Sequence, residues 1–275
     1  MPDTRPLHLT KHHGAGNDFL VLVDADDRIH LDPTVVRALC DRRFGVGADG
    51  VIRIVSGGER ADLAMDLRNA DGSVAEMSGN GMRCLAQAAV AAGLVDPPTF
   101  SVSTLAGVRT VEYRPGDATG SAEASVDMGR AVLGPEEPQA HGERRARRVD
   151  MGNPHLVLLG PDPVGLDVAG LGAGFQGVED GGINVEFVSL GPEPDALTLR
   201  VWERGVGETQ ACGTGAAAAA AVAQDWGLVG STVDVHNPGG TLRVSLAADG
   251  IRLSGPVRKV ADIEVDPRQL LGARR

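Results

Sequence analysis

Two stretches of this chain repeat each other, and the repeat limits the folds that the chain can adopt. Residues 78–95 begin with Ser-Gly-Asn-Gly, and residues 212–229 begin with Cys-Gly-Thr-Gly. A shift of 134 positions carries Ser78 onto Cys212 and carries a closing Gly-Leu-Val onto a second Gly-Leu-Val. A chain with an internal repeat builds repeated structural units. We therefore expect two similar halves.

A second match supports the same division. Residues 16–22 and 152–158 share a Gly-Asn pair and a Leu-Val-Leu run at a shift of 136. Proline and glycine are frequent over residues 134–142, which favours a linker there. We expect an N-terminal half over residues 1–130 and a C-terminal half over residues 131–275, with the last strand packing back on the first half.

The pattern of apolar residues favours many strands and few helices. Helices are expected at 32–42, 81–92 and 216–224, and the third is almost entirely alanine, so strands can enclose it closely. Strands are expected at 7–11, 19–24, 51–55, 61–68, 99–103, 108–113, 124–128, 149–151, 156–159, 184–190, 197–202, 233–236, 242–246, 251–253 and 257–265. The predicted fold is α/β (α+β), with two pseudo-symmetric halves, each a mixed β-sheet or barrel wrapped around a central helix.

Composition excludes several classes of partner. A net charge of −11 disfavours nucleic acid and anionic membrane surfaces, which both require a basic face, and 3% aromatic residues leave little to stack on bases. The one basic run, residues 144–148, is interpreted as a solvated loop edge. Three cysteines without paired spacing indicate neither disulfides nor a zinc site. With no apolar signal core near the N-terminus, we expect a cytoplasmic protein.

Cys212 is the strongest candidate for chemistry. It occupies the last non-helical position before Gly213-Thr214-Gly215, which lead into the predicted alanine helix, and free backbone N–H groups at a helix N-terminus favour negative charge. Such a position is expected to lower the pKa of the thiol and to bind a carboxylate. The glycines at 213 and 215 let a ligand approach the backbone. Ser78 occupies the equivalent position in the first copy of the repeat.

A thiol in this setting can be an acyl-transfer nucleophile, a redox centre or a proton-transfer base. No second cysteine is spaced for disulfide exchange. His155 is the one plausible histidine base, so hydrolysis stays open. The duplication favours proton transfer, because a small molecule held between two helix starts can lose a proton on one face and gain one on the other. Lys11 and Lys259 lie in no phosphate-binding context, which disfavours pyridoxal phosphate and favours a reaction without a cofactor.

Five motifs resemble those of the diaminopimelate epimerase family, in order and over essentially the whole chain. They are Gly14-Ala-Gly-Asn-Asp-Phe19, Asn69-Ala-Asp-Gly72, Gly79-Asn-Gly81, Gly152-Asn-Pro-His155 and the run from Glu203 to Gly215. The resemblance implies a cofactor-independent isomerase that interconverts LL- and meso-diaminopimelate, in lysine and peptidoglycan biosynthesis, by proton transfer at the α-carbon between cysteine acid/base residues. It also implies a homodimer.

The resemblance further implies roles for individual residues. Cys212 and the residue at position 78 would be catalytic, and His155 and Glu203 would tune the thiols. The residues that would bind substrate are Asn17, Asn69, Gly79, Asn80, Asn153, Asn184, Glu203, Arg204, Gly213 and Thr214. Without the resemblance, the asparagines at 17, 69 and 153 fit ordinary turn positions equally well. Cys40 and Cys84 are expected in the core.

Two positions depart from the family pattern. Ser78 stands where the family has a catalytic cysteine, and a serine hydroxyl is a poor base near neutral pH. Either the chain is a Cys→Ser variant of an ordinary epimerase, or the serine is natural and serves a different substrate or a one-sided proton transfer. Alternatives are therefore a racemase or epimerase of another amino acid on the same fold, or a non-catalytic amino-acid-binding protein. Gly50 stands where some members have glutamine.

Overall fold

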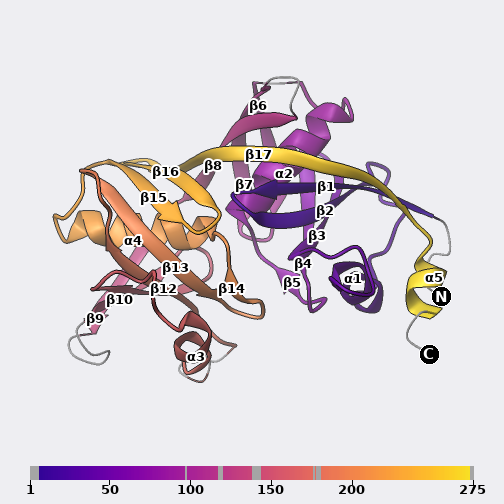
Figure 1. Ribbon diagram of the computed structural model, residues 1–275. Coiled ribbons are helices and arrows are strands. Elements are labelled where there is room, and N and C mark those ends of the chain that lie inside the picture. The colour runs from indigo at the N-terminus through magenta and orange to yellow at the C-terminus, as the bar shows by residue number, and fades with distance from the viewer. Residues whose placement is uncertain are drawn as a thin grey trace. The chain divides into compact units, whose positions relative to one another are not determined.

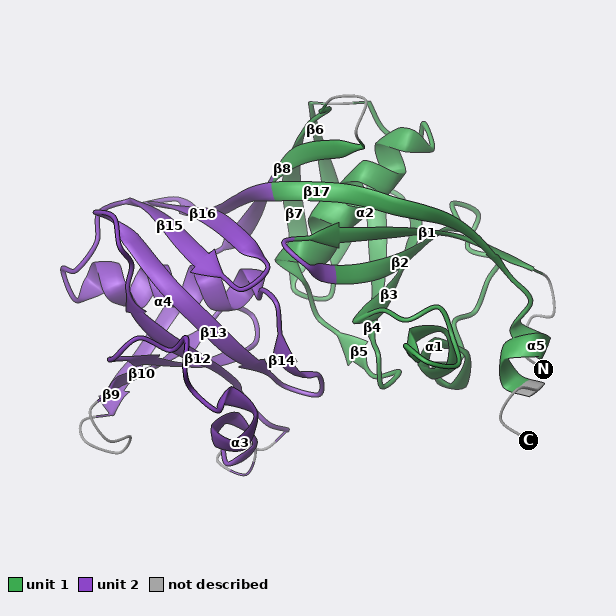
Figure 2. Ribbon diagram, viewed as in Figure 1, with its two compact units in different colours: residues 1–14, 18–124, 256–275 green, residues 15–17, 125–255 purple. Residues whose placement is uncertain are grey.

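The computed structural model describes residues 6–96, 98–116, 120–137, 144–175, 177 and 181–272. The chain forms two compact units, which Figure 2 shows in separate colours. Unit 1 consists of residues 1–14, 18–124 and 256–275, and unit 2 consists of residues 15–17 and 125–255. The domain division at residues 130 and 131 stays a prediction. Among the described residues, no helix is long and apolar enough to span a bilayer.

Unit 1 encloses one helix with strands (Figure 1). Its elements are β1 (Leu7–Gly14), β2 (Asn17–Val23), α1 (Pro33–Cys40), β3 (Gly50–Ser56), β4 (Leu63–Asn69), β5 (Val74–Ala75), α2 (Gly79–Ala91), β6 (Thr99–Thr104), β7 (Gly107–Arg114) and α5 (Pro267–Gly272). Helix α2 packs against β1, β3 and β7, and its residues 79–89 are all buried. The helix is therefore the centre of this unit.

Unit 2 is built in the same way. Its elements are β9 (Val132–Glu137), β10 (Arg145–Asp150), β11 (Pro154–Leu159), α3 (Val168–Ala173), β12 (Asn184–Leu190), β13 (Ala196–Glu203), β14 (Gly207–Thr209), α4 (Gly213–Asp225), β15 (Thr232–Asn237) and β16 (Gly240–Ala247). Helix α4 packs against strands β10 to β13, β15 and β16, and residues 213–223 are all buried. Alanine at residues 216–221 and 223 lets strands approach all round this part of the helix.

Strand pairing confirms that the two halves repeat one topology. In unit 1, β2 pairs with β3 in parallel, β3 with β4 antiparallel, and β4 with both β5 (antiparallel) and β6 (parallel). In unit 2, β11, β12, β13, β14 and β15 pair in the same directions. The registers agree too, because Phe19 lies opposite Gly50 and His155 lies opposite Asn184. Residues 50 and 184 are thus equivalent.

A short outer helix covers the other face of the parallel strands in each unit. In unit 1, Val36 and Leu39 of α1 form one core cluster with Leu20, Leu22 and Val51. In unit 2, Val168 of α3 forms a cluster that includes Leu156, Val185 and Phe187. Because these strands are covered on both faces, β2 and β12 are buried at every position except the last.

Three strands contribute residues to both units, namely β8 (Ser121–Gly129), β17 (Gly250–Val265) and β2, whose first residue, Asn17, belongs to unit 2. The prediction of separate strands at 251–253 and 257–265 was wrong, because β17 continues through Pro256. A proline lacks the N–H that a ladder needs. In β17 it lies between two stretches of pairing, with β16 up to Ser254 and with β1 from Arg258 onward.

The predicted linker and the predicted loop edge are corrected by the structure. Residues 132–137 form strand β9, and residues 138–142 lie outside the described residues. The basic run lies mostly in strand β10, in which Ala146 is buried while Arg147 and Arg148 pair with Asp225 and Glu137. Helix α3 was missed because its Val-Ala-Gly-Leu-Gly-Ala sequence contains two glycines.

A buried histidine, His12, joins β1 to α2 in unit 1. Its Nδ1 lies 2.9 Å from Gln87 Oε1, and its Nε2 lies 2.8 Å from the Thr10 hydroxyl. The amide nitrogen of Gln87 donates to Gly120 O, so Gln87 presents its oxygen to the ring. Nδ1 therefore donates to Gln87, and burial lowers the pKa of His12, which favours the neutral imidazole.

Enlarging a residue of α4 should destabilise unit 2. Ala219 is buried, and a leucine there adds atoms to a helix enclosed by strands. We expect Ala219→Leu to lower the free energy of unfolding by about 1–3 kcal/mol, measured by urea denaturation. Gln224→Leu, on the exposed side of the same helix, should change it by less than about 0.5 kcal/mol. Equal effects of the two substitutions would contradict a closely packed α4.

The neutral state of His12 should make stability depend on pH. Burial, with a smaller effect of Lys259, lowers the pKa of His12 below its ordinary 6.5, so the folded state binds fewer protons than the unfolded chain. The free energy of unfolding should fall as pH decreases from 6.5 through the folded-state pKa, by up to about 1.4 kcal/mol per pH unit. In urea titrations at several pH values, His12→Gln should remove this part of the slope. His8→Gln, at an exposed position of the same strand, should keep it.

Candidate functional site

Cys212 caps the N-terminus of α4, as the sequence predicts. It has extended backbone angles (φ −120°, ψ 119°), and its Sγ accepts a hydrogen bond from Gly215 N at 3.3 Å. The Thr214 hydroxyl lies 3.4 Å from the same sulfur. The residue is 4% exposed, so the thiol is almost completely enclosed by protein.

The predicted lowering of the Cys212 pKa is wrong. Burial, and then the carboxylates of Glu203 and Glu186, raise the pKa of the thiol well above its ordinary value. Hydrogen bonds from Thr214 and from the backbone of Gly215 act in the opposite direction and are weaker. The helix terminus favours a thiolate, but desolvation and two nearby negative groups oppose it. The resting state of Cys212 is a thiol.

Ser78 occupies the same position at the start of α2. Its backbone is extended (φ −142°, ψ 122°), and its Oγ accepts a hydrogen bond from Gly81 N at 3.0 Å. Serine is a favoured residue at this helix position. The shift of 134 therefore relates two residues with the same backbone geometry and the same capping bond, one a thiol and one a hydroxyl.

Arg83 lies in the second turn of α2 and was missed by the sequence analysis. Its side chain is fully buried and bonds to Asn80 Oδ1 at 2.7 Å, with longer bonds to the backbone oxygens of Pro256 (3.3 Å) and Gly79 (3.5 Å). All three acceptors are neutral. Burial lowers the pKa of Arg83 to about 10, so the guanidinium stays charged at neutral pH. Its charge within an otherwise uncharged helix was the sequence signal for it.

Three polar side chains of unit 2, from β11, from β12 and from the residue just before β11, form a hydrogen-bonded series. His155 Nδ1 lies 2.6 Å from Glu186 Oε1, and both side chains are completely buried. His155 Nε2 lies 3.0 Å from Asn153 Oδ1. Asn153 and His155 also line a hollow of about 410 Å³ in this unit. Glu186 was not identified from the sequence, where it sits inside an apolar strand.

Asn184, Glu203 and Arg204 meet at the end of β13. The Asn184 amide donates to Pro154 O at 3.0 Å, and its oxygen accepts from Arg204 N at 3.0 Å. Glu203 accepts a hydrogen bond from the Thr209 hydroxyl across the turn between β13 and β14. The structure therefore brings these three predicted residues to the segment that precedes Cys212.

The Gly14–Asn17 loop belongs partly to unit 2, and its backbone is unusual. Ala15 and Gly16 both have positive φ, 53° and 82°. An added Cβ at Gly16 would lie 2.9 Å from Gln210 Cβ, so this loop packs against the residues just before Cys212. Asn17, which follows in the loop, is 6% exposed.

Asn69 and Gly50 lie opposite each other on β4 and β3 of unit 1. Asn69 Nδ2 donates to the Ser73 hydroxyl at 3.0 Å, a bond within its own turn. An added Cβ at Gly50 would lie 2.6 Å from Arg68 O and 3.2 Å from the Phe19 ring. Position 50 therefore has no room for a glutamine side chain unless its neighbours move.

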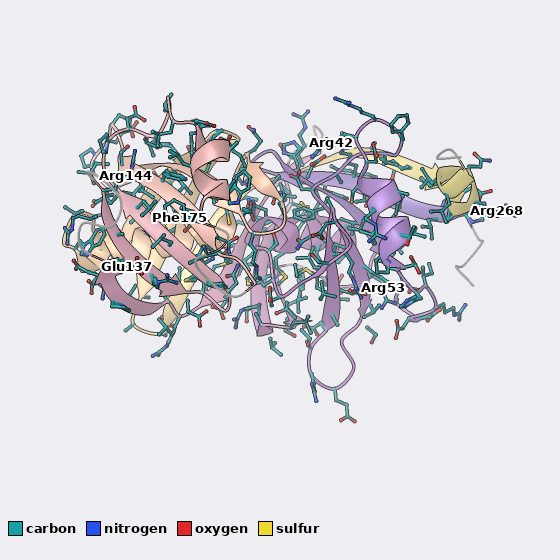
Figure 3. All side chains as sticks on the ribbon, turned by 90° about the horizontal axis from the view of Figure 1, so that it is seen from below. Arg42, Arg53, Glu137, Arg144, Phe175 and Arg268 are labelled. Carbon is teal, nitrogen blue, oxygen red and sulfur yellow. The ribbon has the colours of Figure 1, made fainter. Side chains whose placement is uncertain are left out.

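An ion-pair cluster fixes the loop that leads to Gly50. Arg42, labelled in Figure 3, bonds to Asp18 at 2.6 Å and to Asp49 at 2.7 Å, and Lys11 bonds to Asp18 at 2.8 Å. Although burial opposes ionisation, the hydrogen bonds from Arg42 and Lys11 hold the pKa of Asp18 below its usual range. The cluster joins β1 and β2 to the loop before β3.

The described residues contain no group of three or more histidine, cysteine or acidic side chains arranged to hold a metal ion. Cys40 and Cys84 are both buried, as expected, and burial raises the pKa of each to about 12. Both of these cysteines lie in unit 1, whereas Cys212 lies in unit 2, where Glu203, Glu186 and Thr214 affect its pKa.

A family model described as diaminopimelate epimerase matches residues 9–134 and 147–260. The chain belongs to the diaminopimelate epimerase family. A diaminopimelate epimerase of Corynebacterium glutamicum is 44% identical and one of Mycolicibacterium smegmatis is 42% identical, with 94% of this chain covered in each case and 98% and 96% of those proteins.

Solved structures with the same fold are more distant in sequence. A hydroxyproline epimerase of Agrobacterium vitis, with bound trans-4-OH-L-proline, has a TM-score of 0.75 at 17% identity, over 96% of this chain and 94% of that one. A phenazine biosynthesis protein of Bacillus anthracis has a TM-score of 0.69 at 14% identity, over 95% and 99%. At these identities the likeness concerns the fold, and it supports the predicted class.

In this member of the family, Asn184 should stabilise the folded state in addition to its predicted role in binding substrate. Asn184→Ala removes a donor to Pro154 O and an acceptor for Arg204 N at a residue that is 4% exposed. Leaving buried polar groups without partners costs about 1–3 kcal/mol each, so we expect a loss of unfolding free energy of at least about 2 kcal/mol in urea denaturation. Asn69→Ala removes one exposed bond and should cost about 0.5 kcal/mol. A smaller loss for Asn184→Ala than for Asn69→Ala would contradict this role.

Proposed function

We propose that this protein is a cofactor-independent epimerase that interconverts LL- and meso-diaminopimelate by moving the α-proton. Membership of the family supports the substrate and the reaction. The observation that carries the proposal is the capping geometry of Cys212, an enclosed thiol at the start of a buried helix. A thiol at this place can exchange a proton with a bound α-carbon without a metal or an organic cofactor.

In the proposed reaction, Cys212 handles the α-proton on one face of the α-carbon, and the residue at position 78 handles it on the other. The group that takes the α-proton is left protonated, and the electron pair of the C–H bond stays on the substrate. The α-carbon then takes a proton from the opposite face, and its configuration is inverted. Backbone N–H groups at Gly213 and Thr214 would hold the α-carboxylate, since a helix N-terminus favours an anion.

The remaining predicted residues have supporting roles in this proposal. Gly79 and Asn80 at the start of α2 would offer backbone N–H groups in the same way as the start of α4. Asn17, Asn69, Asn153, Asn184, Glu203 and Arg204 would bind the other polar groups of the substrate. His155 and Glu203 would tune the thiol. Arg83, a buried cation bonded to Asn80, favours a negatively charged ligand near that helix start.

Ser78 is the observation that favours a second candidate. A hydroxyl has no anionic form to populate near neutral pH, so a one-sided proton exchange is expected in place of full epimerisation. If exchange is absent as well, the protein binds an amino acid without acting on it, or it acts on another amino acid. A homodimer and a cytoplasmic location are part of the proposal and rest on the family resemblance and on composition.

Proton NMR in D₂O tests the proposal. The protein, Ser78→Cys and Cys212→Ala are each incubated with LL- and with meso-diaminopimelate, and loss of the α-proton signal and inversion are followed separately. We expect slow exchange and little inversion in the parent, and no exchange in Cys212→Ala. Ser78→Cys should raise inversion by about 10²- to 10⁴-fold, the usual contribution of one acid–base group.

The outcomes separate the candidates. Exchange that survives in Cys212→Ala would overturn the role of the thiol. Absence of exchange in both the parent and Ser78→Cys, combined with tight binding of diaminopimelate, would favour the binding protein. Absence of both exchange and binding would favour another amino acid as substrate, and a panel of amino acids in the same D₂O assay would identify it.

A further inference from the structure

Glu186 is a carboxylate in the interior of unit 2. It lies in β12, where it is 0% exposed between Val185 and Phe187. Burying a carboxylate is unfavourable unless it is paired. Its Oε1 lies 2.6 Å from His155 Nδ1, whereas its Oε2 has no hydrogen-bond partner among the described residues. A half-satisfied buried carboxylate in a core strand suggests a role beyond packing.

The carboxylate lies directly behind the first turn of α4. A Cβ added to Gly215 would lie 2.7 Å from Glu186 Oε1 and 3.3 Å from Cys212 Cβ. Glycine at 215 therefore makes room for Glu186 at the helix start. The same Gly215 donates its backbone N–H to Sγ of the capping residue, Cys212. The carboxylate of Glu186 and the side chain of Cys212 therefore both lie next to Gly215 in the first turn of α4.

The equivalent place in unit 1 is apolar. Residues 50 and 184 are equivalent by register, so Ile52 corresponds to Glu186. A Cβ added to Gly81 would lie 3.1 Å from Ser78 Cβ and 3.2 Å from Ile52 Cδ1, which confirms that Ile52 lies behind the first turn of α2. Phe19 stands in the register position of His155. The two units thus share the geometry of this turn, but unit 1 has an apolar pair, Phe19 and Ile52, where unit 2 has the ionisable pair His155 and Glu186.

The groups that act on Cys212 come from four elements. Glu203 from β13 and Glu186 from β12 disfavour a thiolate, whereas the Thr214 hydroxyl and Gly215 N–H from α4 favour it. His155 from β11 reaches this group through Glu186. Because Glu186 is anchored by His155 and enclosed by the core, its charge is not screened by solvent. Its effect on the thiol is therefore fixed by the fold.

We propose that Glu186 is a positioning residue: joined to His155 behind the first turn of α4, its carboxylate keeps Cys212 in the thiol form, so that Cys212 enters the reaction as the proton donor. This inference rests on the proposed function for the role of the donated proton. In that step the residue at position 78 has already taken the α-proton from the opposite face and left its electron pair on the α-carbon. The S–H bond of Cys212 then breaks, its proton forms a C–H bond with that electron pair, and sulfur is left as a thiolate. The reverse direction restores the thiol.

The rate of alkylation of Cys212 by iodoacetamide, measured by mass spectrometry over a range of pH, tests the inference without any substrate. Glu186→Gln keeps the size of the side chain and removes its charge. We expect the half-point of the pH profile to move to lower pH, with alkylation at pH 8 about tenfold faster than in the parent. Cys212→Ala measures the background from Cys40 and Cys84.

Two further variants keep the test decisive. The double variant Glu186→Ile/His155→Phe places the apolar pair of unit 1 in unit 2, so it should fold if Glu186→Gln does not, and it should also move the half-point to lower pH. Glu193→Gln removes an exposed carboxylate of unit 2 and should leave the profile unchanged. A response in the double variant but not in Glu186→Gln would assign the effect to His155 and overturn the proposal, as would an unchanged profile in both.

Failure of this inference is distinguishable from failure of the proposed function. Alkylation reports the thiol alone, so it gives a result whether or not diaminopimelate is the substrate. If the D₂O assay shows exchange, Glu186→Gln should also move the pH dependence of that exchange to lower pH, a change that a merely structural role would not produce. Urea denaturation of each variant shows whether the fold is retained.

Discussion

Each unit depends on one interaction, the capping of the N-terminus of its central helix by a side chain. Helices α2 and α4 are enclosed by strands, so water cannot satisfy the free N–H groups at their N-termini. Ser78 and Cys212 accept those hydrogen bonds instead. Glycine at the third helical position leaves room for the capping side chain and for the strand behind it. The capping residue of each central helix is thereby also the residue to which the proposed function assigns proton transfer.

The two units share this capping interaction, but they differ in the charged side chains near the capped turn. In unit 1 the turn is backed by Ile52, and a buried cation, Arg83, lies within the helix. In unit 2 the turn is backed by Glu186 bonded to His155, and the buried part of the helix, residues 213–223, carries no charged side chain. The repeated fold therefore carries a buried cation in one central helix and a buried carboxylate behind the first turn of the other.

Much of this arrangement was predictable from local pattern. The capping position of Cys212, the limits of strand 184–190 and the repeat of topology follow from helix signals, apolar runs and the shift of 134. Helix α3 and strand β9 were missed because glycine and proline obscured elements that packing and pairing stabilise. Glu186 was missed because a charged residue in an apolar strand has no local signature that separates a solvent-facing position from a buried one.

The sequence by itself determined the family, the two-fold repeat and the residues that begin each central helix, because these depend on short-range pattern and on ordered motifs. The protonation state of Cys212 was decided only by the tertiary structure. Helix position alone predicts a lowered pKa, yet burial and the carboxylates of Glu186 and Glu203 raise it. Desolvation and Coulomb interactions depend on distance in space, and the strands that bring Glu186 and Glu203 to the thiol are separate from the helix that carries it.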